Sequence, residues 1–315
     1  MTQPLLSRVA ESVYWMSRYI ERAENVARFI SVNLMLMLDL PSGDANQWQP
    51  IIDTTGDAAT FAERYGTATR ENVIEFLAAD PSNLNSIHSC VRAARENARS
   101  VRETISSEMW EQVNSLYLML QEPRREALTF FHQVRMACHL FQGLTDSTMS
   151  HNEPWHFIRL GQALERADKS SRLLDVKYFI LLPSVEDVGT PYDDVQWSAV
   201  LKSVSGFEMY RKRHGRIDPR RIVEFLVLDN DFPRAVRYCL GRADRNLHVI
   251  TGSPAGEFAC GAEQRLGLLR SELDYAPVDS IFSGGLHEFL DALQLKMNKI
   301  DECISGDFFA RTENK

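Results

Sequence analysis

Residues 13–30 read Val13-Tyr-Trp-Met-Ser-Arg-Tyr-Ile-Glu-Arg-Ala-Glu-Asn-Val-Ala-Arg-Phe-Ile30, and apolar side chains recur along them in alternating steps of three and four. This spacing places one apolar stripe along an α-helix. The stripe consists of Val13, Met16, Ile20, Ala23, Ala27 and Ile30. The pattern continues outward over roughly residues 4–39, and Pro41 and Gly43 end it. We predict a long helix packed against other helices, in which two alanines allow a neighbour to approach closely.

The same pattern returns 144 positions later, with the stripe Phe157, Leu160, Leu164, Ala167, Ser171 and Leu174. Polar residues repeat in the same register, because Glu21-Arg-Ala-Glu24 is matched by Glu165-Arg-Ala-Asp168 and Arg28 by Arg172. At an offset of 149, Glu75-Phe-Leu77 falls on Glu224-Phe-Leu226, and Cys90 falls on Cys239. We therefore predict an internal duplication with a first helical copy over 1–145 and a second over 150–310, together forming one compact unit.

The remaining segments also favour helices. We expect them at about 70–79, 83–103, 106–121, 123–142, 153–182, 194–206, 218–229, 233–250, 256–275 and 283–305. Asp218-Pro219 is a helix start, with an N-cap followed by proline at the first helical position. Loops are expected at 40–60 and 183–193, and no stretch alternates with period two. The predicted fold is all-α, a long-helix bundle built from two internally duplicated helical halves.

Composition narrows the class of protein. The 315 residues are 44% hydrophobic and 25% charged, as in ordinary globular proteins, and the net charge of −8 argues against nucleic-acid binding. The N-terminus lacks a signal-peptide pattern, and no apolar stretch approaches the roughly 20 residues of a membrane span. Five dispersed cysteines without a Cys-x-x-Cys pair indicate reduced thiols. We expect a cytoplasmic protein that contacts neither membrane nor nucleic acid.

The repeated charges are the first candidate site. Because the surrounding helix is apolar on more than its stripe, we expect these charges to be partly buried and to form interhelical pairs. Two interpretations stay open: ion pairs that fix helix register, or a polar pocket whose carboxylates handle a proton or bind an amine. The candidate catalytic residues are Glu21, Glu24, Glu165 and Asp168, and their partners are Arg22, Arg28, Arg166 and Arg172.

Metal, nucleotide and nucleophile motifs are missing from the sequence. A two-metal helical bundle needs two Glu-x-x-His motifs, whereas only Glu153-Pro-Trp-His156 occurs, at a helix start. There is no His-x-x-x-His spacing, no glycine-rich phosphate loop and no Gly-x-Ser-x-Gly. Cys90 and Cys239 lie in apolar stretches, which favours packing over reactivity. We predict no metal and no cofactor.

A basic segment, Tyr210-Arg-Lys-Arg-His-Gly-Arg-Ile-Asp-Pro-Arg-Arg221, stands out in this acidic chain. Part of it surrounds a helix N-terminus, which favours anions. One interpretation is a solvated charged loop, and the other is a docking site for a carboxylate, a phosphate or an acidic partner. The candidate binding residues are Arg211, Arg213, Arg216, Arg220 and Arg221.

The chain resembles the alpha-E family of bacterial all-helical proteins along nearly its whole length. The resemblance rests on Ser12-Val-Tyr-Trp-Met-Ser-Arg-Tyr-Ile-Glu-Arg-Ala-Glu-Asn25, Ala94-Arg-Glu-Asn-Ala-Arg99, Glu108-Met-Trp-Glu111, Leu160-Gly-Gln-Ala-Leu-Glu-Arg-Ala-Asp168, Leu173-Leu-Asp-Val-Lys-Tyr178, Tyr210-Arg-Lys-Arg-His214 and Pro219-Arg-Arg-Ile-Val-Glu-Phe-Leu226. Members of this family tend to be encoded beside a circularly permuted ATP-grasp protein, and often beside a transglutaminase-like protein. The resemblance implies a component of an ATP-driven carboxylate–amine ligation system, in which the partner would carry the nucleotide chemistry.

Three functional hypotheses follow. The first is a non-catalytic partner or substrate-presenting component of an amidoligase or peptide-ligation system, which docks through the basic segment. The second is an enzyme that uses the repeated carboxylates for acid–base chemistry on a peptide or amine. The third is a purely structural or regulatory helical protein, which a core without cavities would favour.

Overall fold

The computed structural model describes residues 6–39, 48–122, 126–180 and 191–310. In these ranges the chain forms fifteen α-helices and one π-helical turn and contains no strand. The all-α prediction is therefore confirmed.

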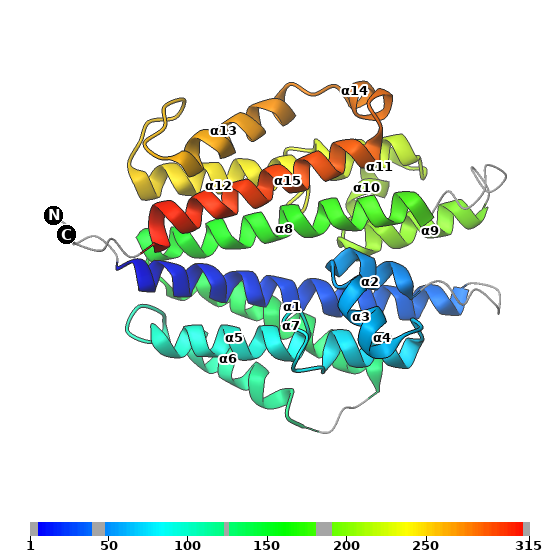
Figure 1. Ribbon diagram of the computed structural model, residues 1–315, viewed down its shortest axis with the longest axis horizontal. Coiled ribbons are helices and arrows are strands. Elements are labelled where there is room, and N and C mark those ends of the chain that lie inside the picture. The colour runs from blue at the N-terminus through cyan, green and yellow to red at the C-terminus, as the bar shows by residue number, and fades with distance from the viewer. Residues whose placement is uncertain (1–5, 40–47, 123–125, 181–190, 311–315) are drawn as a thin grey trace.

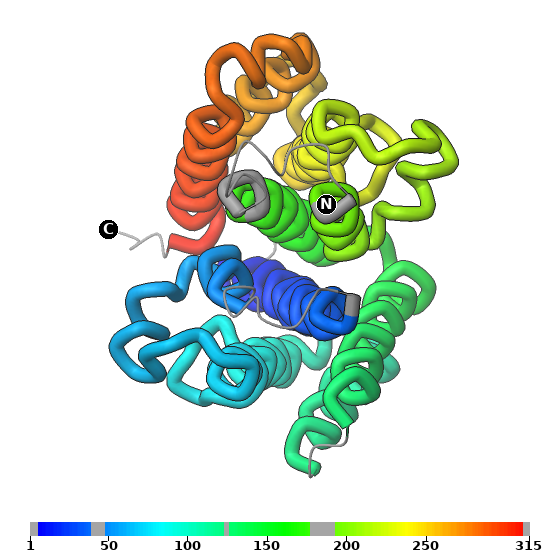
Figure 2. The backbone as a smooth tube through the Cα atoms, turned by 90° about the vertical axis from the view of Figure 1, so that its right-hand side faces the viewer, coloured from blue at the N-terminus to red at the C-terminus, as the bar shows by residue number. Residues whose placement is uncertain are grey.

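Two long helices, α1 (Ser7–Asp39) and α8 (Glu153–Ile180), run side by side through the middle of the molecule (Figure 1). The end-on view shows the other helices arranged around this central pair (Figure 2). On one side α5 (Ile87–Ser100) and α7 (Ala127–Thr148) pack on α1, and α6 (Ser107–Met119) packs on both. On the other side α12 (Val236–Thr251) and α15 (Leu286–Ile304) pack on α8, and α13 (Gly261–Asp274) covers both of them.

The two apolar stripes predicted for the long helices are buried throughout. Each stripe residue is at most 3% exposed, and all except Ser171, which is polar, belong to a continuous core that joins both sides of the molecule. Gly161 shows how closely the helices approach, because a Cβ atom built on it would lie 2.7 Å from the backbone oxygen of Tyr14. The α1–α8 contact is thus the structural centre of the fold.

Shorter helices from each side of the molecule pack against the long helix of the other side. The segment after α1 forms α2 (Gln49–Thr55), α3 (Ala58–Tyr65) and α4 (Arg70–Ala78), and α2 packs on α8. The segment before α12 forms α9 (Pro191–Ser203), α10 (Phe207–His214) and α11 (Pro219–Val227), and α9 packs on α1. Each side therefore contributes a helix that covers the other side's long helix.

The helices of the two sides occur at positions related by the sequence offset of 149. Adding 149 to the bounds of α3 (58–65) and α4 (70–78) yields 207–214 and 219–227, the bounds of α10 and α11. The same shift carries the start of α5 at 87 to the start of α12 at 236. This order is what a duplication would produce, and the duplication itself stays a prediction.

The expected loop at 40–60 is partly wrong, because α2 and the start of α3 occupy residues 49–60. Trp48, Ile51 and Ile52 are buried there, but one or two turns are too short for a periodic signal. The sequence pattern also did not predict α10, α14 (Val278–Ser283) or the turn Ser305–Phe309 that follows α15. Of the expected loop at 183–193, residues 183–190 lie outside the described ranges, and α9 begins at Pro191. The predicted start at Asp218-Pro219 is confirmed, since the Asp218 carboxylate accepts the Arg221 backbone N–H at 2.9 Å.

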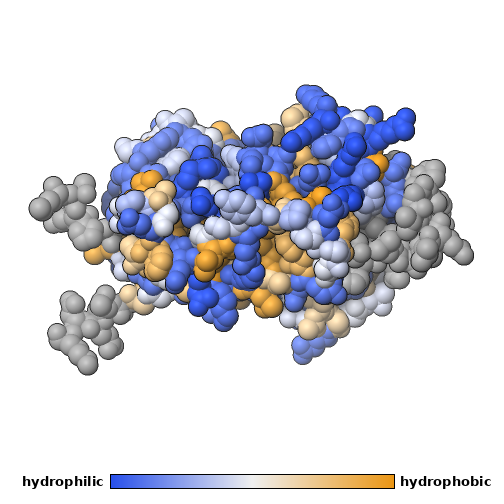
Figure 3. Space-filling view, turned by 90° about the horizontal axis from the view of Figure 1, so that it is seen from above, coloured by the Kyte–Doolittle hydropathy of each residue, from blue (hydrophilic) through white to orange (hydrophobic). Residues whose placement is uncertain are grey.

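The surface over α12–α15 mixes hydrophilic and hydrophobic side chains (Figure 3). Leu268, Tyr275 and Leu295 are exposed large apolar residues in this part of the chain. Scattered exposure of this kind is normal for protein surfaces. These residues therefore do not mark a binding site.

Candidate functional site

Glu21 on α1 and Glu165 on α8 are both completely buried where the long helices meet. The Nε–H of Arg22 donates to Glu165 Oε1 at 2.7 Å, and the Nε–H of Arg166 donates to Glu21 Oε1 at 2.9 Å. Each helix thus supplies the glutamate for the other helix's arginine. The predicted interhelical Glu–Arg pairs are present, and they link α1 to α8 at two points.

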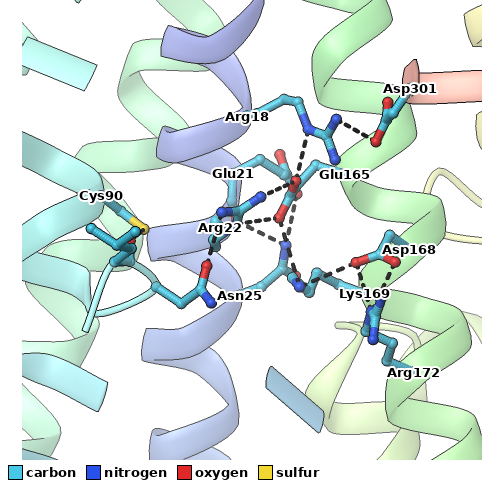
Figure 4. Close-up of polar contacts among 12 residues, drawn as sticks. Arg18, Glu21, Arg22, Asn25, Cys90, Glu165, Asp168, Lys169, Arg172 and Asp301 are labelled. Carbon is cyan, nitrogen blue, oxygen red and sulfur yellow. Dashed lines mark hydrogen bonds and ion pairs between the residues drawn. The ribbon is translucent and has the colours of Figure 1, made fainter. Parts of the chain in front are cut away.

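Glu165 is enclosed by cations. Arg18 donates to its Oε2 at 2.9 Å, and the same guanidinium also reaches Asp301 on α15 at 2.6 Å (Figure 4). The Lys169 ammonium lies 3.9 Å from Glu165 Oε1. Burial raises the pKa of Glu165, but Arg22 and Arg18 outweigh it, so the pKa lies well below its ordinary value. Glu165 is therefore a permanent anion near neutral pH.

Asp168, the counterpart of Glu24 in the repeat, lies at the edge of the Glu165 centre. Its carboxylate accepts hydrogen bonds from Arg172 at 2.8 Å and from Lys169 at 3.1 Å. Burial raises its pKa, whereas Lys169 and Arg172 lower it, and the net shift is downward. Asp168 and Arg172 thus form a pair one helical turn apart on α8.

Glu21 has donors from three other parts of the chain. Its Oε1 accepts from Arg166 at 2.9 Å and from Arg234 at 3.0 Å, and its Oε2 accepts from Gln142 at 2.8 Å. Gln162 lies at 3.3 Å from the same Oε2. Burial raises the pKa of Glu21, but Arg166 and Arg234 outweigh this and bring it to about 2. A carboxylate of this kind is a weak base at neutral pH.

Arg234 is a site residue that sequence reasoning missed. It precedes α12 and joins the two acidic residues of α1, with Nη1 at 3.0 Å from Glu21 and Nη2 at 2.9 Å from Glu24. The offset of 149 places Arg234 on Asn85, a different residue type, so the repeat did not single it out. Asn85 accepts a hydrogen bond from Arg22 at 2.9 Å, so both positions serve the buried charges.

Arg28 closes the Glu24 end of the cluster and is completely buried. Its Nη2 contacts Glu24 Oε1, whereas its Nε and Nη1 find no hydrogen-bond partner among the described residues. Burial, followed by Arg234, holds the pKa of Arg28 well below its ordinary value. His139 on α7 lies 3.5 Å from Glu24, but burial and then Arg28 lower its pKa to about 4. Positive groups therefore exceed negative ones at this end.

The chemistry open to these groups is limited by their burial. Glu21, Glu24 and Glu165 are 0% exposed, so a substrate has no direct access to them. Burial also raises the pKa of Cys90 and of Cys239 to about 12, which leaves both thiols protonated. No group of three or more His, Cys, Asp or Glu side chains suited to a metal ion occurs in the part of the chain that the structure describes.

The arginines of the basic segment lie in different environments in the structure. Arg211 and Arg216 border a cavity of about 500 Å³ between α1, α9 and α10, whereas Arg213 pairs with Asp229 and Arg220 with Asp279. Arg221 is exposed at the start of α11. Apolar residues lining the cavity are Val32, Met35, Leu36, Val195, Ala199, Phe207 and Ile217. The fold thus combines two of the five candidate arginines with an apolar wall.

Fold and site together define an all-helical protein with reciprocal Glu–Arg pairs at its centre. Residues 5–309 match the model of the Alpha-E family, described as a predicted alpha-helical domain with a conserved ER motif, and the chain belongs to this family. Glu-Arg dipeptides occur at 21–22 and 165–166, where they form the reciprocal pairs, and also at 63–64.

Curated relatives include uncharacterised proteins of Mycobacterium bovis and Mycobacterium tuberculosis. Each is 22% identical over 271 residues, which cover 78% of this chain and 30% of the relative. The chain thus corresponds to less than a third of the length of these relatives. No solved structure gives a significant match. None of the described helices is long and apolar enough to cross a membrane.

Proposed function

We propose that this protein is a non-catalytic partner or substrate-presenting component of an ATP-grasp amidoligase or peptide-ligation system. The observation that carries the proposal is the cavity of about 500 Å³ bordered by Arg211 and Arg216. Its size lies within the range of about 300–1,000 Å³ that is usual for ligand pockets. Three cations, Arg211, Arg216 and Lys202, and one carboxylate, Asp194, line the pocket beside its apolar wall. This excess of cations suits a segment of a partner or peptide that carries both apolar and acidic side chains.

Both arginines are available for such a contact. Their side chains form no ion pair with any other residue that the structure describes, and both residues are exposed. The guanidinium of Arg211 lies 5.7 Å from the ring centre of Phe207, which holds it beside the apolar wall. Guanidinium groups form strong paired hydrogen bonds with carboxylates. The expected partner is a circularly permuted ATP-grasp protein, and a transglutaminase-like protein is a further expected partner.

The two alternative functions receive less support. An acid–base enzyme would need accessible carboxylates with pKa values near neutrality, whereas Glu21 is buried and its pKa is about 2. A purely structural role gives no reason for the surface-open pocket of about 500 Å³ beside Arg211 and Arg216.

The test begins with capture of tagged protein from the native bacterium and identification of the partner by mass spectrometry. The affinity of the recovered ATP-grasp protein is then compared between wild type and Arg211→Glu/Arg216→Glu. We expect the variant to lose roughly tenfold or more in affinity, because two charge-assisted contacts become repulsive. Arg92→Glu, exposed on α5, is the matched control. Unchanged affinity in the double variant would refute docking at this cavity.

A further inference from the structure

A second cavity, of about 110 Å³, lies between α8 and α12. Three arginines line it: Arg159 and Arg166 from α8, and Arg242 from α12. Arg166 is also the partner of Glu21, so the cavity adjoins the buried charge cluster. Its volume exceeds the roughly 30 Å³ that a water molecule occupies in the liquid and is far below the ~300–1,000 Å³ of drug-sized ligand pockets. The space therefore suits one small polar group.

Negative charge near this cavity is scarce. The Arg242 side chain makes no ion pair or hydrogen bond with the residues that the structure describes, and Arg159 Nε is buried without an acceptor there. Arg159 does pair with Asp146, but that carboxylate is 45% exposed. Arg166 shares Glu21 with Arg234. No carboxylate from the described ranges therefore lines the cavity beside the three guanidinium groups.

The excess of positive charge affects the arginines themselves. Burial lowers the pKa of Arg159, and Arg166 and Arg242 lower it further, while Asp146 opposes the shift. Burial also lowers the pKa of Arg234 to about 10, with Glu21 opposing and Arg166 adding to the effect. Like charges held together at partly buried positions are unfavourable without a counter-ion. A bound anion would supply the missing negative charge, whereas a cation would be repelled.

We propose that the Arg159–Arg166–Arg242 cavity binds one oxyanion group, a phosphate or a carboxylate. Planar guanidinium groups bind both oxyanions through paired N–H donors, and Arg242 and the Nε–H of Arg159 have donors to spare. The group reaches the protein at the surface between α8 and α12, away from the cavity at Arg211 and Arg216. The inference is independent of the proposed function, because it concerns other residues and requires no partner protein.

Calorimetric titration of the isolated protein with inorganic phosphate, and separately with acetate, tests the site at constant ionic strength set with chloride. We expect saturable binding to one site by wild type. Arg242→Gln should weaken it about tenfold or more, because a hydrogen-bonded charge pair is lost. Arg265→Gln removes the same charge from an exposed position on α13 and should leave the affinity unchanged. Binding of phosphate alone or acetate alone supports the site and identifies which oxyanion it takes.

Thermal unfolding without added anion keeps the test independent of folding defects. Because Arg242→Gln removes an uncompensated cation, the melting temperature of the variant should equal or exceed that of wild type. Added phosphate should raise the melting temperature of wild type more than that of the variant. The proposal is overturned if wild type binds neither anion beyond the chloride control. Equal weakening by Arg242→Gln and Arg265→Gln would also overturn it, since binding would then reflect net charge.

Discussion

At the residue scale, Glu21 is the most heavily bonded carboxylate of the core, with donors from Arg166, Arg234, Gln142 and Gln162. Glu165 has the corresponding place on α8 and receives Arg18 and Arg22. Taking such charges out of water is costly, and their pairing only offsets that cost. We therefore expect the pairs to specify the register of α1 against α8 rather than to add net stability.

Glu21→Gln should lower the free energy of unfolding by about 3–5 kcal/mol, because it leaves Arg166 without its carboxylate partner and Arg234 with Glu24 alone. Urea unfolding at neutral pH measures the effect. Glu11→Gln, an exposed change on the same helix, should stay within about 0.5 kcal/mol of wild type. If the two variants were equally stable, the Glu21 pairs would contribute nothing to folding.

At the element scale, the close approach of α1 and α8 depends on Gly161. A Cβ atom there would lie 2.7 Å from the backbone oxygen of Tyr14 and 2.8 Å from Ser17 Oγ. A backbone atom cannot turn away as a flexible side chain could. The two helices would have to separate, and the reciprocal Glu–Arg pairs would lengthen.

Gly161→Ala should therefore destabilise the protein by roughly 1–3 kcal/mol, the usual cost of overpacking a core. Gly143→Ala on α7 is the control, because no atom lies within 4 Å of its Cβ position. That control should stabilise the helix by about 0.5–1 kcal/mol through backbone propensity. Thermal or urea unfolding distinguishes the two, and equal effects would contradict a tight α1–α8 contact.

At the scale of the whole molecule, stability should depend on pH through the Glu24 end of the cluster. His139 on α7 faces Glu24 and Arg28 of α1, Arg135 of its own helix and Arg234 before α12. The pKa of His139 falls from 6.5 to about 4 on folding, so the unfolded chain binds the proton more readily. This contribution is present above pH 6.5 and is lost as the pH falls towards 4.

Glu21 acts in the same direction at lower pH. Its pKa falls from 4.5 to about 2, so its contribution is present above pH 4.5 and is lost as the pH falls towards 2. We expect the free energy of unfolding to decrease on acidification in two overlapping stages. His139→Asn should remove the stage between pH 6.5 and 4, whereas His132→Asn on the exposed face of α7 should retain it. Urea unfolding across this pH range checks the prediction, and identical pH profiles for the two variants would contradict it.

Much of this architecture was predictable from periodicity. The stripes of both long helices are long enough to be recognised by their spacing, and the repeated Glu-Arg register indicated buried interhelical pairs. Short helices such as α2 and α10 were not predictable, because two turns contain too few apolar residues to establish a period. Arg234 was missed because it lies outside a helix, where no pattern shows which distant carboxylate a side chain will reach.

The all-α class, the two central helices and the charges between them could be predicted from the chain alone, because helical periodicity and register are local properties. Which charges meet and which remain uncompensated became apparent only once the helices were packed. Arg211 and Arg216 border one cavity while Arg213 and Arg220 pair elsewhere. Arg242 meets Arg159 and Arg166 across more than 70 residues of chain. Burial and electrostatic excess depend on distances between elements far apart in sequence, and these distances exist only after the helices have packed.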